Sequence, residues 1–370
     1  MKSTLLSLFV AAGLGSTALA STCYVYVGSY TKGPDGGISL LKMDEATGKL
    51  ENLGVAAAAP NPSFLAVDAK GEFLYAIYEN SPGSVAAYRI DRTTGKLTFL
   101  NKQSAKGDGP CHIIVDKGRK NVLVSNYGSG SMACLPIKED GSLAPASSFH
   151  QHTGTGPNKE RQEAPHAHGA YLSADEKFAL VADLGMDRVV VYHFNSAKGL
   201  LTKNDPPAGI MAPGSGPRHG TFSPDGSKFY VINEMACSVT ALTWNAKAGT
   251  LTQFQDLPTT PKPVPGNSTA EIAFHPNGHV LYGSNRGDNS IVRYSVDKDG
   301  KMKFEDTTST TGPVPRGFAV HPSGKWMIAG VQDENKVVTF AVDPVSGKLT
   351  LHGETTAVGM PVCIAFLHIP

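Results

Sequence analysis

The chain has 370 residues, of which 40 are glycine, 25 are proline and 41% are apolar. Glycine and proline together are far more frequent than a helical bundle would carry, so the composition favours many short strands joined by turns. The formal net charge is +1 and the Lys and Arg residues are scattered, which argues against a nucleic-acid-binding surface.

Residues 1–20 have the layout of a secretory signal peptide. The segment opens on MK, continues with the apolar run LLSLFVAAGLG and ends on ALA, a small-x-small cleavage site. An amphipathic first helix is the alternative, but the segment lacks a polar face. We therefore expect cleavage before Ser21 and a secreted mature chain. No later run reaches the roughly 18 apolar residues of a membrane helix, so no membrane partner is expected.

A layout with a period near 50 residues recurs six times after this segment. Each copy has a first apolar strand, a tight turn and a second apolar strand that ends in polar residues. The copies are NPSFLAVDAKGEFLYAIYEN, GPCHIIVDKGRKNVLVSNYG, APHAHGAYLSADEKFALVADLG, GPRHGTFSPDGSKFYVINEM, STAEIAFHPNGHVLYGSNRG and VPRGFAVHPSGKWMIAGVQD. Their anchors are Pro62, Pro110, Pro165, Pro217, Ala270 and Pro315, spaced 48, 55, 52, 53 and 45 residues apart. Such a period with about four strands per unit is typical of β-propellers.

The two ends of the chain supply the seventh unit. Residues 23–50 resemble a unit that lacks its first strand, and residues 360–368 (MPVCIAFLH) resemble a first strand with nothing after it. Closing the ring in this way leaves no long unpaired sheet edge. The sequence therefore predicts an all-β fold, a single seven-bladed β-propeller domain over residues 21–370.

Turns and cysteines complete the structural expectations. SPDG (223–226), HPNG (275–278) and HPSG (321–324) are predicted to be tight hairpins, which makes His275 and His321 turn residues rather than catalytic ones. The five cysteines have no zinc-type spacing, and in an oxidising compartment one or two disulfides can form among them. They are Cys23, Cys111, Cys134, Cys237 and Cys363.

Polar residues recur where the first strand of each unit begins and where the second ends. A hairpin joins the two strands at the far end, so these positions surround one mouth of the central channel. The first-strand positions are Ser63, Cys111, His112, His166, His168, Arg218, His219, Glu271 and Arg316. The second-strand positions are Tyr30, Glu79, Asn126, Tyr127, Asp183, Asn233, Glu234, Asn285, Arg286 and Asp333. Histidine, arginine and glutamate together suit acid–base chemistry on an anionic substrate; the alternative is an ion-pair network that only rigidifies the channel.

At these residues the chain resembles the lactonase family of seven-bladed propellers, which includes bacterial cycloisomerase-type 6-phosphogluconolactonases and fungal 3-carboxy-cis,cis-muconate cyclase. The resemblance covers essentially the whole mature chain. Its carriers include YVGSYTKGPDGGI, HQHTGTGPNKERQEAPHAHG, VADLGMDRVVVY, GPRHGTFSPDG with YVINE, and NSTAEIAFHPNG with GSNRGDNSI.

The resemblance implies a catalytic group of one histidine from PHAHG with Arg218, Glu234 and Arg286. The motif does not decide between His166 and His168, and strand alternation suggests that both point the same way. The other expected substrate contacts are His112, Asn126, Tyr127, His219, Glu271 and Arg316. No metal or cofactor is expected.

The expected activity is hydrolysis of an anionic lactone, with a histidine that activates water, arginines that bind the carboxylate or phosphate, and Glu234 that orients the histidine or protonates the leaving oxygen. A cyclase acting on an unsaturated diacid is the first alternative. A second is a calcium-dependent lactonase that uses Glu234, Asn126, Asn285 and Asp183, and a third is a secreted propeller that only binds. Because of the signal peptide, a non-phosphorylated sugar lactone or a lactone from aromatic breakdown is favoured over a cytosolic phospholactone.

Overall fold

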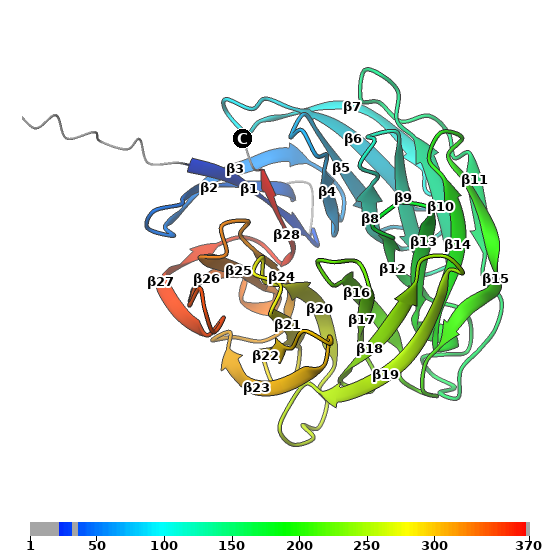
Figure 1. Cartoon of the computed structure of the whole chain (residues 1–370). Coiled ribbons are helices and arrows are strands. Elements are labelled where there is room, and N and C mark those ends of the chain that lie inside the picture. The colour runs from blue at the N-terminus through cyan, green and yellow to red at the C-terminus, as the bar shows by residue number, and fades with distance from the viewer. Residues whose placement is uncertain (1–21, 32–35, 368–370) are drawn as a thin grey trace, which may run out of the picture.

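The computed structural model describes residues 22–31 and 36–367. They form seven four-stranded antiparallel sheets that lie like blades around a common axis (Figure 1). The predicted all-β, seven-bladed propeller is confirmed. The predicted signal peptide, residues 1–20, lies outside the described residues. No helix among the described residues is long and apolar enough to cross a membrane.

Blades 1 to 3 follow one another along the chain. Blade 1 contains β4 (Leu65–Val67), β5 (Phe73–Tyr78), β6 (Ser84–Ile90) and β7 (Leu97–Ser104). Blade 2 contains β8 (Pro110–Val115), β9 (Asn121–Asn126), β10 (Ser131–Pro136) and β11 (Ser148–Gln151). Blade 3 contains β12 (Ala167–Leu172), β13 (Phe178–Asp183), the short 3-10 turn η1 (Leu184–Met186), β14 (Arg188–Asn195) and β15 (Leu200–Ile210).

Blades 4 to 6 repeat the same order of strands. Blade 4 contains β16 (Pro217–Phe222), β17 (Lys228–Asn233), β18 (Ser238–Asn245) and β19 (Thr250–Pro258). Blade 5 contains β20 (Thr269–Phe274), β21 (Val280–Asn285), β22 (Ser290–Val296) and β23 (Met302–Ser309). Blade 6 contains β24 (Pro315–Val320), β25 (Trp326–Val331), η2 (Gln332–Glu334), β26 (Lys336–Val342) and β27 (Leu349–Ala357).

Blade 7 joins the two ends of the chain, as the sequence predicts. It contains β28 (Pro361–Leu367), β1 (Thr22–Ser29), β2 (Gly37–Asp44) and β3 (Leu50–Ala58), in that order. Tyr24 pairs with Leu367 and Gly28 with Cys363. The first strands of neighbouring blades contact one another all around the ring, so they line the axis.

A repeated tyrosine helps to hold neighbouring blades together. It lies on the second strand of one blade and donates its hydroxyl hydrogen bond to a glycine carbonyl in an outer turn of the next blade. The pairs are Tyr26 with Gly95 (2.8 Å), Tyr75 with Gly141 (3.0 Å), Tyr230 with Gly300 (2.7 Å) and Tyr282 with Gly347 (2.6 Å). These rings are fully buried, so each one adds apolar packing and satisfies its own polar end.

A β-bulge opens the first strand of several blades. Pro110 and His112 pair with consecutive residues of β9, which leaves Cys111 out of the ladder. A bulge of this kind re-aims the side chain of the extra residue. The residues left out at the same place in blades 3, 4 and 6 are His168, Arg218 and Arg316. The structure therefore places these three chemically active residues at equivalent positions around the axis.

The register corrects two of the predicted anchors. In blade 3, Ala167 rather than Pro165 pairs with the end of the second strand, as Pro217 does in blade 4. In blade 5 the equivalent residue is Thr269 rather than Ala270. The proline and alanine anchors lie close to the start of each first strand. Which residues are equivalent between blades is set by their hydrogen-bonded pairing with the second strand.

The cysteines also differ from the expectation of disulfides. All five, each within the described residues, are free thiols. The reason is their separation: Cys23, Cys134 and Cys363 lie in different cores between blades, and a disulfide needs two Cβ atoms within about 4.5 Å of each other.

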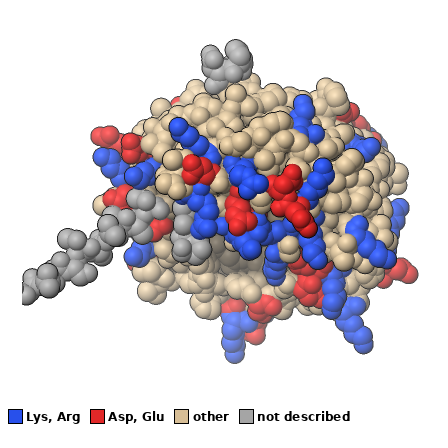
Figure 2. Space-filling model, turned by 90° about the horizontal axis from the view of Figure 1, so that it is seen from above, with Lys and Arg blue, Asp and Glu red and all other residues tan. Residues whose placement is uncertain are grey.

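Charged side chains of both signs are intermixed on the face of the molecule shown in Figure 2. That distribution agrees with the net charge of +1. On this face there is no continuous basic surface of the kind that binds a nucleic-acid backbone.

Candidate active site

A buried carboxylate with three arginines forms the centre of the site. Glu234 directly follows β17 and is 6% exposed. Its Oε2 lies 3.0 Å from Nε of Arg218 and 2.9 Å from Nη2 of Arg286, and its Oε1 lies 2.7 Å from Nη2 of Arg161. Burial alone would raise the pKa of Glu234, but the Arg286 and Arg218 charges outweigh it and lower the pKa to about 2.

Two of these arginines are fixed by backbone carbonyls at the start of β20. Arg218 donates from Nη1 to the Ala270 carbonyl oxygen (2.7 Å), and Arg286 donates from Nη2 to the Thr269 carbonyl oxygen (2.6 Å). Burial and, to a lesser extent, the neighbouring Arg218 charge together lower the pKa of Arg286 to about 10. The Nε of Arg286 has no hydrogen-bond partner among the described residues. A buried, unpaired donor is costly unless a ligand accepts from it.

Arg161 is a site residue that the sequence reasoning did not select. It lies in the long segment between β11 and β12 and also approaches the hydroxyl of Tyr127 (3.3 Å). The only signal was its place within the motif GPNKERQEAPHAHG. Outside the strand repeat, spacing cannot show where a side chain points.

Three buried histidines lie close together beside the arginines. The ring centroids of His168 and His219 are 4.9 Å apart, and those of His112 and His219 are 5.0 Å apart. Burial lowers the pKa of all three well below 6.5, and nearby positive charges, Arg218 for His168 and His219, lower it further. They are therefore neutral at pH 7. Nδ1 of His168 and Nε2 of His219 have no hydrogen-bond partner in the part of the chain that the structure describes.

His219 is oriented by a carboxyl group. Its Nδ1 lies 3.0 Å from Oε1 of Glu271, which also accepts from the backbone N–H of Ile272 (3.0 Å). Burial raises the pKa of Glu271 to about 7. The pair thus combines a neutral imidazole with a carboxyl that titrates near neutral pH.

His166 has a different environment from His168. It precedes β12, its ring stacks on Tyr127 with centroids 4.5 Å apart, and its Nδ1 lies 3.0 Å from the Tyr127 carbonyl oxygen. Its Nε2 lies 3.2 Å from Oε1 of Glu163. Both nitrogens of His166 have polar partners, whereas Nδ1 of His168 has none among the described residues. Simple strand alternation does not apply to the two residues, because the bulge at His168 interrupts the ladder.

A second polar group lies on blades 6, 7 and 1. The guanidinium of Arg316 lies 5.5 Å from the ring centroid of Tyr30. The Tyr30 hydroxyl donates to Oε1 of Glu79 (3.1 Å), and Ser63 donates to the other oxygen of this carboxyl. Arg316 therefore lies among polar side chains that come from three blades.

Several predicted ring residues form hydrogen bonds within their own blade or to the blade before it. Asn126 is fully buried and donates to the Ala105 carbonyl oxygen (3.0 Å) and to Ser131 (3.1 Å), so its amide nitrogen anchors loops of blades 1 and 2. Asn233 and Asn285 act in the same way, Asp183 binds His152 (2.6 Å), and Asp333 is exposed in η2.

These contacts bear on the calcium alternative. Of its four oxygen donors, Glu234 is paired with arginines, Oδ1 of Asn285 accepts from Asn267 and Asp183 contacts His152. Oδ1 of Asn126 has no hydrogen-bond partner among the described residues, but it belongs to a different blade from the other three. Calcium needs six to eight oxygen ligands around one point. The residues present do not form that arrangement.

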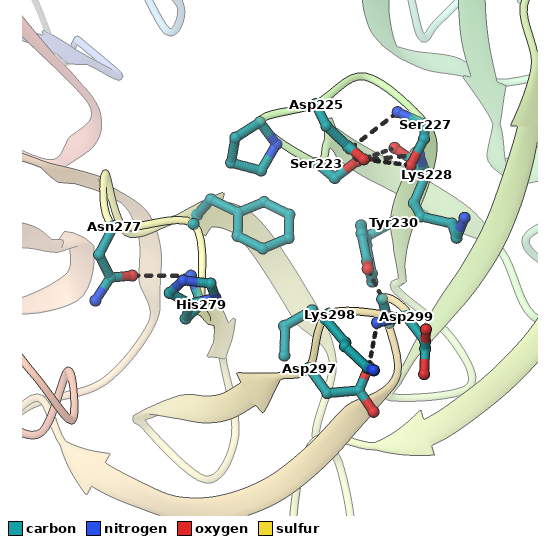
Figure 3. A pocket seen from close by; sticks show the side chains of 15 residues that line it. Ser223, Asp225, Ser227, Lys228, Tyr230, Asn277, His279, Asp297, Lys298 and Asp299 are labelled. Atoms are coloured by element: carbon teal, nitrogen blue, oxygen red, sulfur yellow. Dashed lines mark hydrogen bonds between the residues drawn. The ribbon is translucent and has the colours of Figure 1, made fainter.

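A separate cavity of about 410 Å³ lies at the opposite end of the strands, between the β16–β17 and β20–β21 hairpins and the β22–β23 turn (Figure 3). Its polar groups are used by their own turns: Asp225 accepts from Ser223 and Ser227, and these hydrogen bonds lower its pKa to about 2. Asp297 accepts from the backbone N–H groups of its turn. Turn geometry explains these residues, so the arginine and histidine group remains the candidate active site.

Several known proteins resemble this chain over most of its length, and their names refer to lactone hydrolysis. A family model described as lactonase, 7-bladed beta-propeller, matches residues 24–366. A 6-phosphogluconolactonase of Bacillus subtilis is 38% identical over 93% of this chain and 98% of its own, and one of Formosa agariphila is 33% identical over 88% and 94%. The solved periplasmic gluconolactonase of Pseudomonas aeruginosa is 30% identical, with a TM-score of 0.89 over 95% of this chain and all of its own. The chain belongs to the family of seven-bladed β-propeller lactonases.

Proposed function

We propose that this lactonase hydrolyses the internal ester of an anionic sugar-acid or related lactone at the site formed by His168, Arg218, Glu234 and Arg286. The observation that carries the proposal is the charge imbalance: three guanidinium groups surround the single Glu234 carboxylate. Excess positive charge in a buried site is costly unless an anion offsets it. A carboxylate or phosphate on the substrate would supply that anion.

The general base in this proposal is His168. It is neutral, and its Nδ1 is enclosed by the protein without a hydrogen-bond partner among the described residues, so it can accept a proton from a water molecule that enters with the substrate. The resulting hydroxide attacks the lactone carbonyl carbon, and Arg218 or Arg286 stabilises the oxyanion. The ring C–O bond then breaks, and the leaving oxygen takes a proton.

The proton donor in this scheme is the His219–Glu271 pair rather than Glu234. A carboxyl group with a pKa of about 2 holds almost no proton at pH 7, whereas Glu271, with a pKa of about 7, is close to half protonated. Glu234 then has the role of fixing the arginines. This changes the expected role of Glu234 while keeping it in the site.

The named relatives suggest the substrate class, and the first residues suggest the compartment. Their names give 6-phosphogluconolactone and gluconolactone hydrolysis. We propose that residues 1–20 are a signal peptide and that the mature chain is secreted, which favours a non-phosphorylated lactone. N-terminal sequencing of the protein recovered outside the cytoplasm tests this step, and an intact Met1 there would contradict it.

The first test is a panel of sugar lactones, phosphorylated and not, with muconates alongside and chelator present throughout. The protein lacking residues 1–20 is expected to hydrolyse at least one lactone in chelator. Arg218→Ala is expected to lower kcat/KM by about 100- to 1000-fold, because it removes a donor aimed at the developing charge.

Arg293→Ala is the matched control, since Arg293 also forms an ion pair, with Asp306 (2.8 Å), on the outer strands of blade 5. It should keep full turnover. Unchanged turnover in Arg218→Ala would refute the proposed site, and conversion of a muconate without lactone hydrolysis would point to the cyclase alternative.

The pH dependence offers a second test through Glu271. Below a pH of about 7 this carboxyl group is protonated and can supply the proton for the leaving oxygen through His219; above that pH it is ionised and holds no proton to give. We expect kcat/KM to fall as pH rises through about 7 in the wild type, and this fall to be lost in Glu271→Gln. An identical fall in the variant would assign the titration to another group.

A further inference from the structure

A compact group of three metal-binding side chains lies at the junction of blades 6 and 7. Cys23 is near the start of β1, Glu45 follows β2, and His321 follows β24. Their sulfur, carboxylate oxygen and imidazole nitrogen atoms all lie within 4.8 Å of one another, with Nε2 of His321 3.4 Å from Oε1 of Glu45. We propose that this group is a structural site for Zn²⁺ or a cation of similar thiol affinity, distinct from the catalytic site.

The chemistry of the three side chains fits this class of ion. Thiolate, imidazole and carboxylate are the ligands that Zn²⁺ takes in proteins, whereas calcium and magnesium take oxygen ligands. Cys23 and His321 are each 2% exposed, and the Glu45 side chain is 20% exposed. The carboxylate side therefore leaves a route for the ion and for a water molecule as fourth ligand. On binding, the Cys23 thiol loses its proton to solvent and the sulfur–metal bond forms.

The repeat provides an internal comparison for the histidine. His275 occupies the same turn position in blade 5: its Nδ1 accepts from the N–H two residues on (3.1 Å), and its Nε2 lies 2.8 Å from the Gly324 carbonyl oxygen of the next blade. His321 has the equivalent contact at Nδ1, with Ser323. Towards the next blade, however, its Nε2 lies near the Glu45 carboxylate, and the Cys23 thiol belongs to the same group.

The neighbourhood of His321 also supports metal binding. The Ser323 hydroxyl lies 2.8 Å from Nδ1 and can accept a hydrogen bond from Nδ1–H when Nε2 holds a metal; in that tautomer Nδ1 no longer accepts from the Ser323 backbone N–H. Such a partner fixes the orientation of a ligating imidazole. The Glu45 backbone is held as well, because its carbonyl oxygen accepts from Nε1 of Trp326 (2.8 Å).

The position of the group suggests what the ion would do. Cys23 lies on β1 in blade 7, which closes the ring, and His321 lies in blade 6. An ion between them would tie the closing blade to its neighbour. The group is at the start of β1, whereas the end of β1 leads to Tyr30 and the channel mouth, so lactone hydrolysis would not require the ion.

The test uses Co²⁺ as a spectroscopic probe on reduced protein lacking residues 1–20, freed of metal with a chelator and then desalted. Wild type is expected to bind one Co²⁺ per chain with thiolate-to-cobalt charge-transfer absorption, and Zn²⁺ is expected to displace it and raise Tm. Cys23→Ser should lose the absorption and the Tm rise. Glu45→Gln, at a partly exposed position, should weaken Co²⁺ affinity by at least about 10-fold and remain folded.

Matched controls are Cys237→Ser, which removes a thiol elsewhere, and His275→Gln, which removes the equivalent turn histidine. Both should keep the absorption. The proposal would be overturned if the wild type lacked the thiolate-to-cobalt absorption or if Cys23→Ser kept it. If Cys23→Ser does not fold, an unchanged Co²⁺ affinity in Glu45→Gln would overturn the proposal instead. Lactone hydrolysis in chelator is measured separately, so failure here is distinguishable from failure of the proposed activity.

Discussion

Replacing His168 with glutamine is expected to lower kcat for the lactone by about 100- to 10,000-fold, the usual contribution of a positioned general base. The free Nδ1 of His168 lies in a buried site beside His219 and close to the arginines. Glutamine keeps a polar side chain of similar length but cannot accept and release a proton at neutral pH. Steady-state kinetics across pH 5–9 would measure the loss, and KM should change far less than kcat.

His166→Gln is the matched control from the same motif. Its two nitrogens already contact Tyr127 and Glu163, so its loss should change kcat by less than about 10-fold, as expected for a residue that acts through its neighbours. The reverse ranking of the two variants would assign the base to His166. Equal and small effects would move the base to His219.

The repeat made the propeller and its closure predictable from the sequence. Every blade has alternating apolar strands and turn residues, and the pattern recurs with a period near 50 residues. Chance alone rarely produces such a recurrence. The same repeat located Arg218, Glu234 and Arg286, because equivalent positions in successive blades must lie around one axis. The structure adds that Arg218 and Arg286 converge on the Glu234 carboxylate.

The errors arise where the strand pattern does not show how a side chain is placed. Arg161 enters the site from a long segment without a repeat equivalent. The bulge at His168 changes which residues of PHAHG are equivalent to other blades. Asn126 sits at the predicted place, but its amide nitrogen donates to a loop carbonyl oxygen and to a hydroxyl, because buried N–H groups need acceptors. The direction of a side chain and its hydrogen-bond partners depend on residues that are distant in the sequence, so the strand pattern alone does not give them.

Glu234→Gln is expected to destabilise the protein by about 3–5 kcal/mol, the usual cost of removing one partner from a buried ion pair. Glutamine has nearly the same volume, but it leaves Arg161, Arg218 and Arg286 without their shared carboxylate. Chemical denaturation monitored by intrinsic fluorescence would measure the free energy of unfolding. Arg293 and Asp306 again supply the control: Asp306→Asn, which breaks a more exposed pair, should cost no more than about 1 kcal/mol.

The pH dependence of this difference follows from the lowered pKa of Glu234. The carboxylate stabilises the folded chain fully above its ordinary pKa of 4.5, and this stabilisation is lost as pH falls towards about 2. The difference in the free energy of unfolding between wild type and Glu234→Gln should therefore narrow as pH falls from about 5.

Added phosphate should stabilise Glu234→Gln more than wild type, because an anion can take the place of the missing charge among the arginines. A variant as stable as the wild type at pH 7, with no greater response to phosphate, would show that the arginines do not depend on Glu234, and the charge argument for an anionic substrate would then lose its basis.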